Sequence, residues 1–160
     1  MIRKIPPSEI AAILNVVNDA AQAYKGAIPA DCWKQPYITA KELKDELERG
    51  VKFYGWFEPD GLVAVMGIQP VKDITLIRHA YVLTSHQRRG IGERLLRHLT
   101  KLAPTREILV GTWTAAWWAV RFYEKNGFRL IPLESRSKLR QYWTISDRQA
   151  ETSVVLKLER

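Results

Sequence analysis

The feature that most restricts the fold of this chain is a short basic turn, residues 87–92, between an apolar segment and an amphipathic one. Residues 74–83 are apolar and rich in β-branched side chains, as expected of a buried strand. After the turn, apolar residues recur at helical spacing at Ile91, Leu95, Leu99 and Leu102. The pattern predicts a strand that enters a helix through a turn of arginines and glycines.

A turn of this kind is suited to binding a phosphorylated anion. The first N–H groups of a helix have no intrahelical partner, and the helix dipole and nearby arginines add positive charge. Glycines at positions 90 and 92 would let a pyrophosphate approach the backbone. The alternative is a plain strand-to-helix connection with a solvated basic surface. The turn is neither the dinucleotide fingerprint, because Leu95 stands at its third glycine position, nor a phosphate loop of the Gly-x-x-x-x-Gly-Lys-Ser/Thr kind.

Composition restricts the class of protein further. With 160 residues, 46% of them apolar and 26% charged, the chain has the composition of an ordinary globular domain with a sizeable core. No apolar run approaches the roughly 20 residues that span a bilayer, and no signal core follows residues 1–6, so we expect no membrane partner. The single cysteine, Cys32, excludes an internal disulfide and suits a cytoplasmic protein. Cys32 and the three histidines lack metal-ligand spacing, so no metal is expected.

The chain is strongly basic, with a formal net charge of +8 and a sequence pI near 9.7. Such a balance favours polyanionic partners, namely nucleic acid, an acidic surface or a highly phosphorylated cofactor. Basic residues cluster at 88–89 and 136–140. A phosphorylated cofactor would use part of this charge, and the remainder is expected to form a solvated face.

The order of the predicted elements indicates one mixed α/β domain without internal repeats. Strands are predicted at residues 2–5, 51–57, 62–71, 74–83, 107–113, 128–131 and 152–158. Helices are predicted between Ser8 and Tyr24, Thr39 and Gly50, Ile91 and Leu102, and Ala116 and Asn126. Ser8 and Thr39 are the expected N-caps, and Gly127 is the expected C-terminal glycine. Residues 132–150 receive no assignment.

Two segments of the chain match motifs of a known family. Three residues of the turn fall on the defining positions of the pattern Gln/Arg-x-x-Gly-x-Gly/Ala: Gln87, Gly90 and Gly92. A later segment matches Ala-x-x-Phe-Tyr-x-x-x-Gly-Phe at Ala119, Phe122, Tyr123, Gly127 and Phe128. With both motifs in this order, the chain resembles the GNAT superfamily of acyl-CoA-dependent N-acetyltransferases from about Val51 to Phe128. It departs from the family at Ala116, where many members carry an asparagine; Thr112 or Thr114 is the alternative polar contact.

The resemblance implies a single GNAT-like domain over residues 1–160, of the α/β (α+β) class. Its sheet would be central, mixed and mostly antiparallel, with about seven strands flanked by about four helices. In that fold the fourth and fifth strands part, and acetyl-CoA enters the gap. The pantetheine would pair with the backbone of Tyr81, Val82 and Leu83 as an added strand does. The phosphates would contact Gln87, Arg88, Arg89, Gly90, Ile91, Gly92 and Glu93.

The resemblance also implies a general acid. Tyr123 stands where many members carry a tyrosine that protonates the coenzyme A thiolate as it leaves, and Tyr123 would then also contact the cofactor. The alternative is a core tyrosine on an amphipathic helix. A general base is harder to identify, because the glutamate that members commonly place on the central strand is absent. Within residues 74–83, His79 is the side chain that could act as a base. The alternative is that His79 is a hydrogen-bonded structural histidine.

Strand alternation predicts that Ile77, His79 and Tyr81 share one face of the sheet, whereas Leu76, Arg78 and Ala80 share the other, unless a bulge shifts the register. If its face is the open one, Arg78 would bind an acidic group of the substrate. In the family the acceptor pocket is formed by the first two helices, their loop and the late hairpin. The candidate substrate-binding residues are therefore Tyr24, Asp31, Trp33 and Tyr37, with Tyr142 and Trp143.

These observations predict an N-acetyltransferase that transfers the acetyl group of acetyl-CoA directly to a primary amine of a small molecule or peptide. Cys32 as an acyl-carrying nucleophile has no nearby base in the sequence. Two alternatives remain: a non-catalytic acyl-CoA sensor, which would not need Tyr123, and a basic nucleic-acid-binding module. The second lacks a recognition helix or an aromatic RNA-binding motif. The protein is expected to be a monomer or a homodimer in the cytoplasm.

Overall fold

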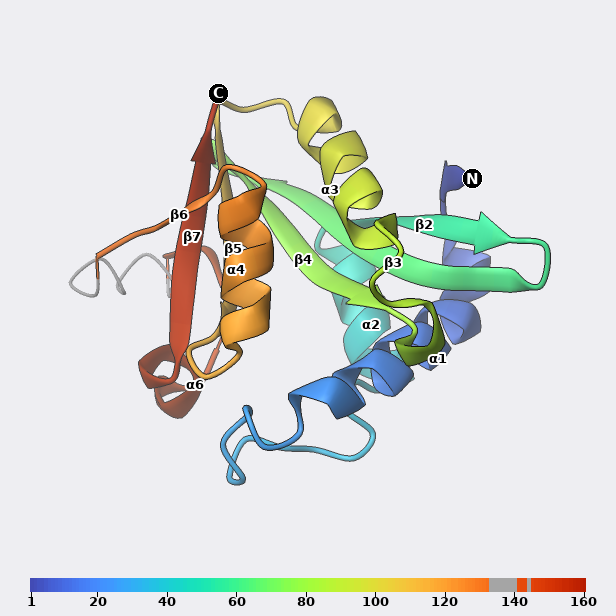
Figure 1. The fold of residues 1–160 in the computed structure, drawn as a ribbon, viewed down its shortest axis with the longest axis horizontal. Helices are drawn as coiled ribbons and strands as arrows, with labels where there is room; N and C mark the ends of the chain where they lie inside the picture. Colours follow the sequence, from blue (N-terminus) through green and yellow to red (C-terminus); the bar gives the residue numbers. More distant parts are fainter. Residues whose placement is uncertain (133–140, 144) are drawn as a thin grey trace.

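A seven-stranded sheet forms the centre of the molecule (Figure 1), a computed structural model that describes residues 1–132, 141–143 and 145–160. The strand order is β1-β2-β3-β4-β5-β7-β6. Every neighbouring pair is antiparallel except β4 and β5, which are parallel. The predicted mixed, mostly antiparallel sheet is confirmed. The basic cluster at 136–140 lies outside the described residues.

The first strand and helix differ slightly from the prediction. Strand β1 covers Ile2–Lys4, a 3-10 turn covers Pro7–Glu9, helix α1 covers Ile10–Ala20, and a second 3-10 turn covers Ala21–Tyr24. Ser8 as an N-cap is wrong, because Pro7 starts a 3-10 turn that already contains Ser8 and no side chain caps either element. The helical stretch does reach Tyr24, as predicted.

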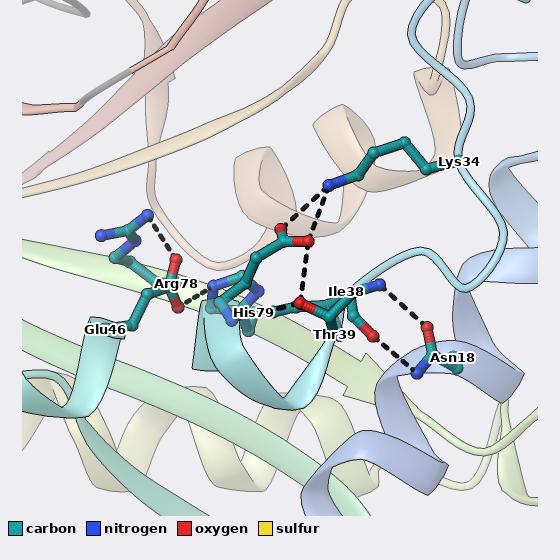
Figure 2. Close-up of polar contacts among 8 residues, drawn as sticks. Asn18, Lys34, Ile38, Thr39, Glu46, Arg78 and His79 are labelled. Carbon is teal, nitrogen blue, oxygen red and sulfur yellow. Dashed lines mark hydrogen bonds and ion pairs between the residues drawn. The ribbon is translucent and has the colours of Figure 1, made fainter. Parts of the chain in front are cut away.

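Helix α2, Ala40–Glu48, is fixed at its start by side chains. The Thr39 hydroxyl oxygen accepts a hydrogen bond from the Glu42 N–H at 3.2 Å, which confirms the predicted cap. One residue earlier, Asn18 of α1 bonds both backbone groups of Ile38, donating to its carbonyl at 3.1 Å and accepting from its N–H at 3.0 Å (Figure 2). These contacts tie the beginning of α2 to α1 and set the position of the helix on the sheet.

The sheet separates two main hydrophobic clusters. Strands β2 (Lys52–Glu58), β3 (Gly61–Val71) and β4 (Ile74–Val82) form the middle of the sheet. On one face, Phe53 and Val65 pack with buried residues of α1 and α2, among them Val17 and Leu43. On the other face, apolar residues of α3 and α4 pack against the sheet: Ile91, Leu95, Leu96, Leu99 and Tyr123. Helices therefore cover both faces, so the domain has three layers (Figure 1).

The second half of the chain completes the sheet. Helix α3 covers Ile91–Leu102, strand β5 Glu107–Trp113 and helix α4 Trp117–Lys125. Strands β6 (Arg129–Leu130) and β7 (Ser153–Glu159) follow, with a short helix α6, Asp147–Glu151, just before β7. Gly127 has a positive φ of 92° after α4, as expected of a C-terminal glycine. Except for Glu151, helix α6 falls in the segment 132–150, which received no assignment from the sequence.

The cap of α2 gives a stability prediction. Replacing Thr39 by alanine removes the acceptor for the Glu42 N–H, so we expect the free energy of unfolding to fall by about 1 kcal/mol. Thr39→Ser keeps the hydroxyl, so its free energy of unfolding should fall by less than half as much. Urea unfolding followed by circular dichroism measures both changes. Equal losses in the two variants would mean that the hydroxyl does not cap the helix.

Candidate active site

The basic turn presents open backbone donors, as its sequence predicts. Strand β4 ends at Val82, and a 3-10 turn at Thr84–His86 leads into residues 87–92. Gly90, the residue before α3, has a φ of 77°, and no side chain caps the helix. A side chain added at Gly90 would meet nothing within 4 Å. The first N–H groups of α3 therefore have no capping side chain at the positive end of the helix.

Strands β4 and β5 part next to this turn. Their pairing begins at Ile74 with Glu107 and ends at Ile77 with Val110, although β4 continues to Val82 and β5 to Trp113. Figure 1 shows the two strands together at one end and apart at the other. The parting exposes backbone groups of β4 that a sheet would normally pair, which is the gap predicted from the family.

A cavity of about 690 Å³ runs from the turn into this gap. It is lined from the turn and α3 by Gln87, Arg88, Gly90, Ile91, Gly92 and Glu93, and from β4 by Ala80, Tyr81 and Val82. Helix α4 adds Trp117, Trp118, Ala119, Phe122, Tyr123 and Lys125. Of the predicted cofactor contacts, Leu83 and Arg89 are not among the lining residues. Neither Thr112 nor Thr114 lines this cavity, and Ala116 is fully buried.

A smaller cavity of about 150 Å³ lies on the other side of the gap. Its lining includes Tyr37, Arg78, His79, Thr112 and Trp143. The two cavities share four lining residues: Tyr24, Ala80, Tyr81 and Tyr123. They therefore meet where β4 and β5 separate, which would allow groups bound in the two cavities to contact each other.

Tyr123 lies at this meeting point. The side chain is only 6% exposed and packs edge-on against Phe122 and Phe128, with ring centroids 5.1 and 5.6 Å away. Burial raises the pKa of the Tyr123 phenol well above its ordinary value. The phenol is therefore protonated at neutral pH and faces the gap as a hydrogen-bond donor.

A bulge in β4 changes the predicted faces of the strand. Gly67 of β3 pairs with Arg78 and Val65 pairs with Tyr81, so Met66 alone opposes His79 and Ala80. His79 has a φ of 52°, which is unusual for a residue other than glycine. The prediction that Arg78 and His79 lie on opposite faces is wrong, because the extra residue turns both side chains toward α2.

Glu46 of α2 meets both of these side chains (Figure 2). Its Oε1 accepts a hydrogen bond from Arg78 Nη2 at 2.9 Å, and its Oε2 contacts His79 Nε2, a contact that is ionic only when the histidine is protonated. Arg78 also donates to Gln69 Oε1 at 3.2 Å, and Gln69 donates to the Arg49 carbonyl at 3.0 Å. Burial would raise the pKa of the Glu46 carboxyl, but the hydrogen bond from His79 and the charges of His79, Arg78 and Arg49 hold it below its ordinary value.

The predicted substrate-binding residues divide into two groups. Tyr24 and Tyr37 line the smaller cavity, and burial beside Tyr37 raises the pKa of Tyr24 to about 12. Asp31 does not line it and instead accepts a hydrogen bond from Arg148 Nε at 3.0 Å. Trp33 packs on the Tyr37 ring, with centroids 5.9 Å apart, outside the cavity lining.

The remaining candidate substrate-binding residues also divide into those that line the smaller cavity and those that do not. Trp143 lines the smaller cavity, whereas the Tyr142 hydroxyl donates to Asp73 outside it. Arg78 lines the cavity, but it already holds Glu46 and Gln69. Its role as a receptor for an acidic substrate group stays a prediction.

Sequence reasoning missed Glu46 and Gln69. A signal for Glu46 was present, since it follows the inward-facing Leu43 by three residues and so lies on the same side of α2. No comparable signal marks Gln69, whose role depends on its partner Arg78 in the next strand. Among the described residues, no group of His, Cys, Asp and Glu could hold a metal ion, and no helix is long and apolar enough to cross a membrane.

This geometry is that of an acyltransferase of the GNAT class, and the chain belongs to that family. Residues 48–130 match the model of the acetyltransferase (GNAT) domain. No curated protein matches the sequence significantly. The family assignment therefore depends on the domain model, the two motifs and the fold.

Solved structures share the whole fold at low sequence identity. The PaiA N-acetyltransferase from Thermoplasma acidophilum, solved with coenzyme A, is 16% identical with a TM-score of 0.76, covering 100% of this chain and 98% of its own. A GNAT-family acetyltransferase from Staphylococcus aureus is 18% identical with a TM-score of 0.74, covering 99% and 98%. The Escherichia coli ribosomal-protein-S18-alanine N-acetyltransferase is 16% identical with a TM-score of 0.72, covering 99% and 92%.

The lowered pKa of Glu46 gives a pH prediction. The stabilisation from this carboxylate is complete above its unfolded-state pKa of about 4.3 and is lost as the pH falls through the lower folded-state value. Glu46→Gln should therefore reduce the free energy of unfolding by about 2 kcal/mol at pH 7. The difference from the wild type should shrink below about pH 4.

Urea unfolding from pH 3 to pH 7 measures this dependence. Glu48→Gln makes the same change at an exposed position of the same helix and is the matched control. A Glu46→Gln deficit that stays constant over the whole pH range would contradict an ionised Glu46.

Proposed function

We propose that this protein is an acetyl-CoA-dependent N-acetyltransferase that transfers the acetyl group directly to a primary amine. The observation that carries the proposal is the meeting of two cavities at the gap between β4 and β5. The larger cavity begins at a turn suited to phosphate, and the smaller is lined by a histidine that contacts a partly buried carboxylate. Acyl donor and amine acceptor would enter from opposite sides and meet beside Tyr123.

The larger cavity suits the parts of acetyl-CoA in order. The pyrophosphate would accept hydrogen bonds from the open N–H groups at the start of α3, with Arg88 adding positive charge. The pantetheine would extend along Tyr81 and Val82, where β4 has lost its partner strand. The thioester would then lie near Tyr123, whose side chain lines both cavities. The complex of the similar PaiA structure with coenzyme A is consistent with this arrangement.

The chemistry needs a proton acceptor and a proton donor. The amine nitrogen attacks the thioester carbonyl carbon, a C–N bond forms, and the C–S bond breaks as the tetrahedral intermediate collapses. The proton that the nitrogen loses goes to His79, and the thiolate takes a proton from the Tyr123 phenol. Transfer from His79 to the phenolate through solvent restores both groups, so protons balance over one turnover.

The smaller cavity restricts the acceptor. At about 150 Å³ it is of a size to hold the amine-bearing end of a small molecule or a peptide rather than a whole folded segment. Tyr24, Tyr37 and Tyr81 would surround that end with aromatic rings and hydroxyl groups. We propose an acceptor whose primary amine is carried on a short, slender group.

The phosphate-binding role of the turn predicts the effect of a charge at Gly90. Glutamate there would repel the pyrophosphate and should weaken acetyl-CoA binding at least tenfold in calorimetric titration, whereas Gly90→Gln adds the same bulk and backbone strain without charge. Equal binding by the Glu and Gln variants would rule out the turn as the phosphate site. A wild type that binds no acetyl-CoA would overturn the enzyme proposal and favour the nucleic-acid alternative.

The proposed acid predicts a specific kinetic defect. Tyr123→Phe removes the proton donor but keeps the ring that packs on Phe128, so kcat should fall on the order of 10²-fold while acetyl-CoA binding is unchanged. Release of the free coenzyme A thiol, measured across a panel of primary amines, gives kcat and identifies the acceptor. Binding of acetyl-CoA without turnover of any amine would instead favour the sensor alternative.

A further inference from the structure

We infer that Glu46 is a positioning residue that holds His79 in the tautomer and orientation of a general base. The inference rests on the proposed function, because it assigns a second member to the base of that reaction. It differs from a general base carried on the central strand itself, because this carboxylate comes from helix α2 and not from β4. The observations are the split contacts of Glu46, the bulge at His79 and the cavity that His79 lines.

The two oxygens of Glu46 have separate partners. Oε1 accepts from Arg78 Nη2 at 2.9 Å, while Oε2 contacts His79 Nε2 (Figure 2). Neither Oε2 nor His79 Nε2 has another polar partner among the described residues, and both atoms are buried. Gln69 orients Arg78 and is itself bonded to the Arg49 carbonyl at the end of α2. The carboxylate is thus held by one partner at each oxygen.

This pairing determines which nitrogen of His79 is available. A carboxylate only accepts hydrogen bonds, so a neutral His79 must carry its proton on Nε2, facing Oε2. The other nitrogen, Nδ1, then has a free lone pair and no hydrogen bond to a described residue. Because the ring lines the smaller cavity, that lone pair is the basic group offered to an acceptor amine.

The backbone at His79 suits the same purpose. A φ of 52° is strained for a histidine and is maintained here by the bulge against Met66. Without the bulge, alternation would direct His79 and Arg78 to opposite faces, and Glu46 could not hold both. The ring also packs against Phe53 and Tyr81, with centroids 5.9 and 6.5 Å away, which restricts its rotation.

Glu46 supplies the carboxylate that contacts His79. The charged and titratable groups around His79 come from α2 and its C-terminal end, β4, α4, the 3-10 turn Ala21–Tyr24 and the loop before α2. They are Glu46, Arg49, Arg78, Tyr24, Tyr37, Tyr81 and Tyr123. Burial raises the pKa of Tyr81 well above its ordinary value, and that of Tyr24 to about 12, so these phenols are neutral at working pH. When Nδ1 takes the proton of the attacking amine, the imidazolium that forms is stabilised by the Glu46 carboxylate, which itself stays ionised.

The direct test is the tautomer of His79, read from ¹⁵N chemical shifts of the labelled full-length protein at a pH where the ring is neutral. The chain has three histidines, so His79→Asn assigns the signal. We expect the proton on Nε2 in the wild type. In Glu46→Gln, Arg78 should take the single amide oxygen, so that the amide NH₂ faces Nε2 and the proton moves to Nδ1. Glu48→Gln, exposed on the same helix, should leave the tautomer unchanged.

The kinetic test separates positioning from folding. With the best amine of the panel, Glu46→Gln should lower kcat on the order of 10²-fold with KM changed less than about threefold, because the amine still binds but Nδ1 no longer accepts its proton. Combining Glu46→Gln with His79→Asn should be no slower than His79→Asn alone, since the two residues act as a unit.

The outcomes distinguish this inference from the proposed function. A wild-type proton on Nδ1, or an unchanged tautomer in a folded Glu46→Gln variant, overturns the positioning role without reference to activity. A tautomer that moves with no loss of kcat overturns it as well. The expected tautomers in a protein that binds acetyl-CoA but acetylates no amine would support the Glu46–His79 pairing while overturning the enzyme proposal.

Discussion

The loss of pairing between β4 and β5 beyond Ile77 is the constraint on which the rest of the site depends. Parallel strands normally continue side by side, because each unpaired backbone group that is buried costs free energy. Here β4 continues to Val82 and β5 to Trp113 without each other, and cavities lie on both sides of the opening. The unpaired backbone is the part of the sheet that a bound extended group would complete. Residues of the turn and Tyr123 line the larger cavity at this gap.

The bulge at His79 is the second constraint, and it couples the gap to helix α2. One extra residue in β4 turns two consecutive basic side chains to the same face, where a single carboxylate meets both. Such a buried ionic group contributes little net stability compared with apolar packing of the same volume. Its retention is better explained by orientation, because a carboxylate held by Arg78 cannot follow the histidine ring. The His79 ring packs against Phe53, with centroids 5.9 Å apart, in the backbone conformation that the bulge sets.

Those parts of the molecule that depend on local sequence were predictable. The strand, turn and helix around Gly90 follow from periodicity and from glycine's access to positive φ, and the Thr39 cap and Gly127 follow from side-chain chemistry within a few residues. The faces of the sheet on which Arg78 and His79 lie were not predictable, because the bulge depends on how Met66 opposes β4 across the sheet. The position of Glu46 was predictable in part. Its spacing from Leu43 indicates the side of the helix on which it lies, but only the tertiary structure shows that it meets β4. The prediction of Ser8 as an N-cap was wrong because Pro7 starts a 3-10 turn one residue earlier.

The charges that line the smaller cavity indicate whether an acceptor would bind there as an ammonium ion or as a neutral amine. Among the described residues its lining contains no acidic side chain, and Arg78 adds a positive charge. An ammonium ion entering this space would lose hydration without gaining a carboxylate partner, which is costly. The neutral amine, which alone has a lone pair to attack with, loses far less. The Glu46 carboxylate contacts His79 and is not among the residues that line the cavity, so its negative charge is not presented directly to the substrate. The site would therefore favour the deprotonated amine on binding and provide a place for the proton that bond formation releases.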